Sequence, residues 1–319
     1  RGGGVFGRGD VTLTDSTVSG NSTAGSVAGG GGVFSWNDVT LTNSTVSGNR
    51  TAGVNAEGGG IFGRGVRLTD STVSGNSTAG YFSRGGGVAG GFGDVTLIDS
   101  TVSGNSTAGD VADGGGVYGR NDVTLTDSTV SGNSTAGNGA DGGGVFGFFG
   151  VTLTDSTVSG NSTAGLGARG GGIFGYGVTL TNSTVSGNSA VGDNARGGGV
   201  YGYNSVTVSN SIVLGNSAAT DPEISGLVTE GGPNIIGGED PADVFAAIDP
   251  ATGGGQLADN GGPTETIALL PGGLAVDMGD DGLAPATDQR GVARPQGPAS
   301  DLGAFELVPG ELGTVLAAV

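Results

Sequence analysis

Residues 5–21 read VFGRGDVTLTDSTVSGN, and this phrase returns eight times along the chain with small changes. Each copy ends in an Asn, and successive Asn residues lie 27 to 29 positions apart. Such a regular repeat indicates a solenoid, in which every copy forms one structural unit and stacks on neighbours like itself. The eight residues are Asn21, Asn49, Asn76, Asn105, Asn133, Asn161, Asn188 and Asn216.

Within the phrase, apolar and polar residues alternate with a period of two, which is typical of β-strands. In the first copy, Val11, Leu13 and Val18 are expected to face the core. In the preceding GGGVFG segment, Val5 is expected to face inward and Phe6 outward. Helix is disfavoured because Gly, Ser, Thr and Val dominate the phrase.

Three short strands in each repeat of about 28 residues predict an all-β fold, a right-handed parallel β-helix of eight coils. Residues 1–220 hold the repeat array. Most of the 10 Pro residues follow residue 220, so residues 221–319 are predicted to form a less regular β segment that continues or caps the helix.

The composition of the 319 residues narrows the classes of function. The chain has no Cys and no His, and all 11 basic residues are Arg against 30 acids, which gives a net charge of −19. Disulfides and thiolate metal sites are therefore excluded, and a nucleic-acid partner is disfavoured because phosphate binding needs a basic surface. No apolar run reaches the ~18 residues of a membrane span. An acidic, repetitive β protein of this kind suits an extracellular or cell-surface location.

The recurring Asn is predicted to be structural, because stacked amides can hydrogen-bond from coil to coil. Many copies also form N-x-S/T sequons, such as Asn21-Ser22-Thr23, but an inward Asn would not be accessible for glycosylation. Position 15 and its counterparts hold Asp or Asn, and this exchange favours a turn-closing role over a Ca²⁺ ladder.

A second ladder places an aromatic residue after the inward Val of GGGVFG, with Ala89 in the fourth copy. Outward-facing rings would form a contact surface for a partner, either another subunit or a sugar polymer. Folding of the glycine-rich loops over the rings is the alternative, and both readings stay open. The ladder residues are Phe6, Phe34, Phe62, Tyr118, Phe146, Phe174 and Tyr201.

Outward Thr residues recur as well, as in Thr12 and Thr14, and regular T-x-T arrays on flat solenoids are a feature of ice-binding proteins. Arg67 and Ile98 interrupt this array, and Thr is also the ordinary residue of an exposed strand. Ice binding is therefore retained only as an alternative, alongside polysaccharide binding.

Catalytic residues are not assigned. Polysaccharide lyases of β-helix architecture use Ca²⁺ bound by clustered Asp with a Lys or Arg base, and the hydrolases use paired Asp with a His and a Lys. This chain has no His and no Lys, which removes most of these arrangements. A divergent lyase or hydrolase is the third class considered. Four acids bunch in a Gly/Pro-rich stretch, which we interpret as a loop, with a Ca²⁺ site as the alternative. They are Asp277, Asp280, Asp281 and Asp288.

Two stretches of sequence resemble known families. The phrases GGGVFG and VTLTDSTVSGN resemble the β-helix repeats of large bacterial secreted and surface proteins, and are similar to repeats of polymorphic outer-membrane proteins. Residues 234–306 resemble the choice-of-anchor Q domain, through Asn234-Ile-Ile-Gly-Gly, LADNGGPTETIALLPGGLAVDMGD (257–280) and TDQRGVARPQGPASDLGAFE (287–306). The resemblance implies an exported bacterial protein and no catalytic residues.

These observations together predict a non-catalytic extracellular structural protein, a β-helical rod that associates with copies of itself head to tail. Because Arg1 lies within the repeat phrase, we expect an open strand edge at the first coil, on which the apolar tail Val315-Leu316-Ala-Ala-Val319 of a neighbour docks. A filament subunit and a segment of a longer adhesin stalk explain these features equally well. Binding of a surface or matrix polysaccharide is the alternative function.

Overall fold

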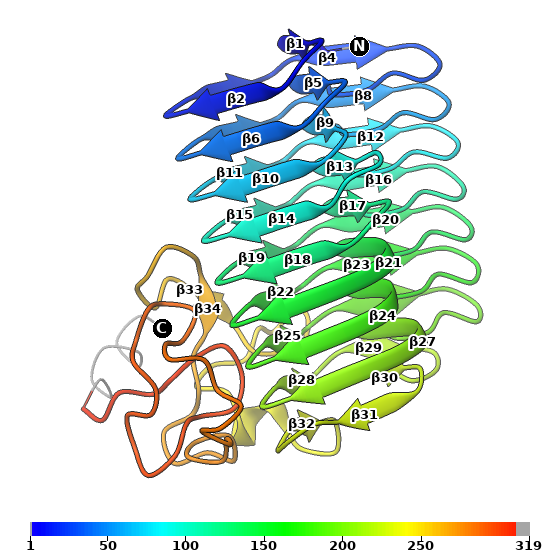
Figure 1. Cartoon of the computed structure of the whole chain (residues 1–319). Coiled ribbons are helices and arrows are strands. Elements are labelled where there is room, and N and C mark those ends of the chain that lie inside the picture. Colours follow the sequence, from blue (N-terminus) through cyan, green and yellow to red (C-terminus); the bar gives the residue numbers. More distant parts are fainter. Residues whose placement is uncertain (1, 311–319) are drawn as a thin grey trace.

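The computed structural model describes residues 2–310, and it shows an all-β solenoid of about eight stacked turns (Figure 1). All pairing between coils is parallel and in register: Val11 pairs with Val39, and Val39 with Val66. The predicted parallel β-helix is therefore confirmed. The hydrophobic tail at residues 315–319 lies outside the described residues.

The first sheet contains the GGGVFG and VTLT segments of every coil. Its strands are β1 (Val5–Gly7), β5 (Val33–Ser35), β9 (Ile61–Gly63), β13 (Val88–Gly90), β17 (Val117–Gly119), β2 (Val11–Thr14), β6 (Val39–Thr42), β10 (Val66–Thr69), β14 (Val95–Ile98), β18 (Val123–Thr126), the merged β21 (Val145–Thr154), β24 (Ile173–Thr181) and β27 (Val200–Ser209), and the short β30 (Ile224–Ser225) and β31 (Val228–Glu230).

The second sheet is built from the T-V-S segments, and it ends on a strand beyond the eighth repeat. Its strands are β3 (Thr17–Ser19), β7 (Thr45–Ser47), β11 (Thr72–Ser74), β15 (Thr101–Ser103), β19 (Thr129–Ser131), β22 (Thr157–Ser159), β25 (Thr184–Ser186), β28 (Ile212–Leu214) and β32 (Ile235–Ile236).

A third sheet corrects the expected layout of the coil. The Ser-Thr-Ala stretch after each Asn, expected to be loose, is itself a strand, so the first five coils have four strands where three were predicted. Its members are β4 (Ser22–Ala24), β8 (Arg50–Ala52), β12 (Ser77–Ala79), β16 (Ser106–Ala108), β20 (Ser134–Ala136), β23 (Ser162–Ala164), β26 (Ser189–Val191) and β29 (Ser217–Ala218). The central Thr of this strand points inward, as the buried Thr78 does.

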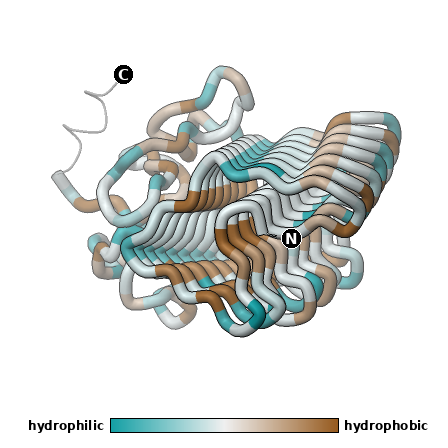
Figure 2. The backbone as a smooth tube through the Cα atoms, turned by 90° about the horizontal axis from the view of Figure 1, so that it is seen from above, coloured by the Kyte–Doolittle hydropathy of each residue, from teal (hydrophilic) through white to brown (hydrophobic). Residues whose placement is uncertain are grey.

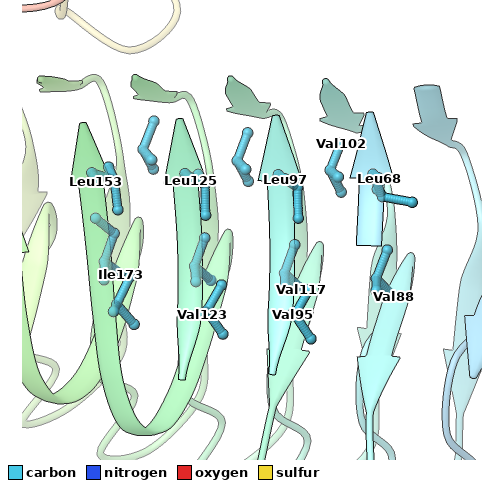
Figure 3. Packing of buried hydrophobic residues seen from close by; sticks show 14 of the residues in the cluster. Leu68, Val88, Val95, Leu97, Val102, Val117, Val123, Leu125, Leu153 and Ile173 are labelled. Atoms are coloured by element: carbon cyan, nitrogen blue, oxygen red, sulfur yellow. The ribbon is translucent and has the colours of Figure 1, made fainter. Parts of the chain in front are cut away.

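The core consists of columns of identical aliphatic side chains that run along the axis. Val95, Leu97 and Val102 of one coil are fully buried and lie in line with their counterparts in the next (Figure 3). In the view from the end of the stack, apolar residues form continuous stripes from coil to coil (Figure 2). Because each coil buries only a few side chains, stacking supplies the burial that one coil lacks.

The turn between the first two sheets depends on the Asp or Asn at position 15 and its counterparts. All eight adopt a left-handed backbone conformation, with φ between 42° and 49°. Asp and Asn tolerate this region better than other residues with a side chain, which explains their free exchange. The predicted turn-closing role is confirmed.

The C-terminal segment continues the helix only briefly. After β32 the chain folds back along the outer face of the second sheet, beside β19, β22, β25 and β28 (Figures 1 and 2). This part contains the 3₁₀ turn η1 (Pro241–Asp243) and an antiparallel pair, β33 (Leu257–Ala258) and β34 (Thr266–Ile267). It has its own apolar cluster, in which Phe245, Leu269 and Phe305 pack with Ile212 and Leu214 of β28.

Candidate functional site

The Asn ladder runs through the solenoid as one chain of hydrogen bonds. In the middle of it, Asn105 donates from Nδ2 to Oδ1 of Asn133 and to the carbonyl oxygen of Val73, both at 2.9 Å. Its own Oδ1 accepts the backbone N–H and the Nδ2–H of Asn76, also at 2.9 Å. Every polar atom of this buried side chain is therefore paired, as a buried amide requires.

The amide also fixes the neighbouring backbone. A Cβ atom at Gly87 would lie 2.9 Å from Cγ of Asn105, so only glycine allows this close approach. The same contact recurs between the third Gly of each GGG run and the Asn of its coil, which explains why both persist in all eight copies. The buried position also places the sequon Asn out of reach of glycosylation.

The sequence analysis missed two features here: the residue that ends this ladder, and a second ladder that runs beside it. Glu223 ends the Asn ladder: its carboxylate accepts the Nδ2–H of Asn216 at 2.6 Å, and burial raises the pKa of Glu223. A parallel ladder is formed by Ser, in which the Ser100 hydroxyl accepts the backbone N–H of Ser71 at 3.1 Å. Asn234 closes that ladder by accepting from the backbone N–H of Ser211, which gives a role to the NIIGG motif.

The aromatic ladder faces away from the central core but is not a solvent-exposed row. Rings of adjacent coils stack at centroid distances of 4.8 to 5.6 Å, for example 4.8 Å between Phe146 and Phe174. Yet Phe34, Phe146 and Phe174 are buried. Of the two readings, folding of the loops over the rings is confirmed, and the expected exposed surface is wrong for most of the row.

The cover comes from the loops that follow the third sheet. These loops pair with one another in register, through bridges such as Glu57 with Arg84. Their Arg residues lie on the ring faces: the guanidinium carbon of Arg84 is 5.3 Å from the Tyr118 centroid, and that of Arg169 is 5.0 Å from Phe174. Such cation–π contacts stabilise the closed arrangement. Phe6, at the first coil, stays 45% exposed.

A second row of side chains, which the sequence analysis missed, lies two residues beyond the ladder in most coils, and we call it the rim row. Unlike the ladder, it is exposed: Phe92 is 65% exposed and Trp36 is 49% exposed. The regular recurrence of these residues in the repeats could have identified the row from the sequence. It comprises Trp36, Arg64, Phe92, Arg120, Phe148, Tyr176 and Tyr203.

Two hollows lie between the rim row and the covering loops. One has a volume of about 420 Å³ and is lined by Trp36, Phe34, Phe62 and Glu57, among others. The next has about 440 Å³. Its walls include Arg84, Asp113 and Tyr118 on the loop and ladder side, and Arg120 and Phe148 on the rim side. Phe92 lines both hollows, so they adjoin along the axis, and we call the two together the groove. These volumes fall within the usual range of small-ligand sites.

The two Thr strips have different surroundings. Outward residues of the first sheet, such as Thr12 and Thr152, are exposed, with Arg67 among them. In the second sheet, Thr129, Thr157 and Thr184 are buried because the C-terminal segment lies on them. Their hydroxyls bond this segment, as in the 2.7 Å contact from Thr157 Oγ1 to Oε1 of Gln289.

The acids bunched near residue 280 serve the backbone of their own loops. Asp281 accepts the backbone N–H and the hydroxyl of Ser300, both at 2.8 Å, and these bonds lower its pKa. Oδ1 of Asp280 accepts the backbone N–H of Gly282 at 2.8 Å. Within residues 2–310 no cluster of acids has the arrangement of a metal site, so the Ca²⁺ alternative at Asp277, Asp280 and Asp281 is not supported.

A buried charge cluster, instead, holds the C-terminal segment on the solenoid. Arg294, 1% exposed, lies 3.0 Å from the carboxylate of Glu306 and 3.5 Å from that of Asp155 in the β-helix. Asp288 pairs with Arg290 at 2.9 Å, and the guanidinium carbon of Arg290 is 3.7 Å from the Phe305 centroid. The DQRGVARP motif is therefore a structural clamp.

The clamp contains more carboxylates than its cations can balance. The pKa of Asp155 is raised to about 8, first by burial and in addition by Asp127 and Asp288, although Arg294 opposes this shift. Because Glu306 already neutralises Arg294, the protonated form of Asp155 has a lower free energy than the buried carboxylate. Burial likewise raises the pKa of Asp301 to about 6.

No family model, curated protein or solved structure matches this chain. What the fold and the ladders define is a parallel β-solenoid repeat protein. Among residues 2–310, no helix is both long enough and apolar enough to cross a membrane.

Proposed function

We propose that the chain is a non-catalytic structural rod of an extracellular or cell-surface protein. The observation that carries this proposal is the unbroken Asn ladder from Asn21 to Asn216, which joins every coil to the next through buried amides. Eight coils spaced about 4.8 Å apart give a stiff axis of roughly 34 Å. A ladder of copies suits a load-bearing or spacing role, whereas catalysis needs a unique constellation of groups.

We further propose that the rod associates head to tail with copies of itself, as a filament or matrix subunit or as part of an adhesin stalk. Two observations support this. Every coil pairs with the next in parallel and with matching residues opposite one another, so a coil of one copy offers backbone groups that suit the strands of another. The aromatic rings stack from coil to coil in the same way, and the 45% exposed ring of Phe6 suits such a contact. The resemblance to bacterial surface repeats and to choice-of-anchor Q domains agrees with such a role.

Electron microscopy and light scattering of the purified chain over a range of concentrations test the association. We expect filaments one solenoid wide that lengthen with concentration. Phe6→Lys places a charge on the end face and should leave short particles, whereas Phe148→Lys, on the flank and 55% exposed, should leave the filaments intact. Short particles of one size from the unaltered chain would refute head-to-tail growth.

A separate experiment tests the proposal that the chain is not an enzyme. Incubation with acidic polysaccharides should release no shortened products. Product release that Asp280→Ala abolishes would replace the structural proposal with the lyase or hydrolase class.

A further inference from the structure

We propose that the groove between the rim row and the covering loops binds a neutral polysaccharide chain that lies along the solenoid axis. The groove has an aromatic floor and an aromatic wall, formed by ladder rings such as Tyr118 and by the exposed Trp36, Phe92 and Phe148. Exposed rings collected along one line are unusual on a soluble surface and mark a binding site.

The shape of the groove favours a long, repeating ligand. Its two hollows share Phe92 and follow one another along successive coils. The exposed rings Trp36, Phe92 and Phe148 alternate with Arg64 and Arg120, so they recur at every second coil, about 9.6 Å apart, which is comparable to the length of two sugar rings. The C–H groups on the face of a pyranose pack on aromatic rings, and its hydroxyls need polar partners beside them.

The polar groups of the groove suit hydroxyls. Arg84 and Arg120 supply donors and Glu57 supplies acceptors, and Asp113, whose pKa is raised to about 8 mainly by burial, can both donate and accept, as the two-way hydrogen bonding of a hydroxyl requires. Arg84 is held in this wall by both carboxylates, with Glu57 at 3.3 Å from its Nη1 and Asp113 at 4.0 Å from its Nε.

Charge then selects a neutral polymer over an acidic one. Arg84 is already paired with Glu57 at 3.3 Å and lies 4.0 Å from Asp113, and the guanidinium carbon of Arg120 lies 4.7 Å from the Phe92 centroid. The chain as a whole carries −19 and would repel a polyanion. An extended peptide is also disfavoured, because the covering loops already pair in register, for example Arg84 with Asp113, and leave no strand edge along the groove.

The test uses the unaltered chain with defined hexasaccharides: cellohexaose, mannohexaose and chitohexaose as neutral probes, and hexagalacturonate as the acidic probe. Trp36 is the only tryptophan and lines the groove, so its fluorescence reports occupancy directly, with calorimetry as the second measurement. We expect at least one neutral probe to change the Trp36 emission, with a Kd of about 1 mM or tighter.

Phe92→Ala should weaken that binding by about tenfold or more, because its ring contributes to both hollows. Met278→Ala, a similarly exposed change on the C-terminal segment, should have no effect. Circular dichroism checks that both variants are folded. Failure of all neutral probes to bind, unchanged affinity in Phe92→Ala, or preference for hexagalacturonate would each overturn the proposal. None of these outcomes bears on filament formation, which Phe6→Lys tests separately.

Discussion

Removal of a single amide from the middle of the Asn ladder should destabilise the solenoid far more than the same change at its end. Asn105→Ala deletes four hydrogen bonds, which join Asn105 to Asn76, Asn133 and Val73. The backbone N–H of Asn76 then loses its acceptor in a buried site, whereas its Nδ2 keeps the carbonyl oxygens of Val46 and Ser74 as acceptors.

The magnitude follows from the orphaned N–H and the other lost bonds. A buried donor left without a partner costs about 1–3 kcal/mol, and each of the three other lost hydrogen bonds contributes about 0.5–1.5 kcal/mol, so the loss of unfolding free energy is about 2–7 kcal/mol. Asn21→Ala is the matched control. Asn49 Oδ1 still accepts the backbone N–H of residue 21 at 2.9 Å in that variant, so only the partly exposed side-chain bonds of Asn21 to Asn49 and to the Ser19 carbonyl, both 3.0 Å, are lost and no buried donor is orphaned. The expected cost is below about 1 kcal/mol.

Guanidinium unfolding, followed by circular dichroism and by Trp36 fluorescence, measures both free energies. The two probes must give coincident transitions, because a repeat array can unfold in parts. Equal destabilisation by Asn105→Ala and Asn21→Ala, within about 0.5 kcal/mol, would show that the ladder does not act as a connected network.

Three further predictions concern the clamp and the turns. The pKa of Asp155 is raised, mainly by burial, to about 8 in the folded chain, compared with ~4 for an unfolded Asp. Between these two pH values the folded chain therefore binds one proton more than the unfolded chain, so the free energy of unfolding falls as pH rises from about 4 to 8. In thermal melts, Asp155→Asn should raise Tm at pH 8 and leave it unchanged at pH 4; an equal gain at both would contradict this. Arg294→Gln leaves the Glu306 carboxylate buried without its cation, at a cost of about 3–5 kcal/mol, and should speed hydrogen exchange in residues 237–310 but not in residues 2–120. Asp70→Val, at φ 47°, should cost about 1–2 kcal/mol in chemical denaturation, whereas Asp70→Asn should cost almost nothing.

The coil could be predicted because the neighbours of each residue in a solenoid are its own copies. Period-two alternation placed Val11 and Leu13 inside, and the repeat length alone then set the register with Val39 and Leu41. The Asn ladder was predictable for the same reason. The Ser-Thr-Ala strand was not, because its small side chains resemble those of a loop.

Features outside the coil depend on contacts that alternation does not encode. Whether Phe34 is exposed depends on the path of the loop at Gly29, where a Cβ atom would lie 3.0 Å from the ring. The sequence does contain a sign that the C-terminal segment covers the second sheet. In the eighth repeat the outward Thr and Ser of T-V-S become Ile212 and Leu214, which are buried against the C-terminal segment.

The three sheets thus have different outer surroundings, and this division limits where a ligand can bind. The C-terminal segment occupies the second sheet over β19 to β28 through Thr129, Thr157 and Thr184. The covering loops follow the third sheet and close over the ladder rings. A chain-like ligand can therefore follow the axis in the groove beside the first sheet without displacing either. Binding there would leave the Asn ladder and the end faces untouched, so the proposed association through the ends and the proposed binding of a polymer along the flank are compatible with each other.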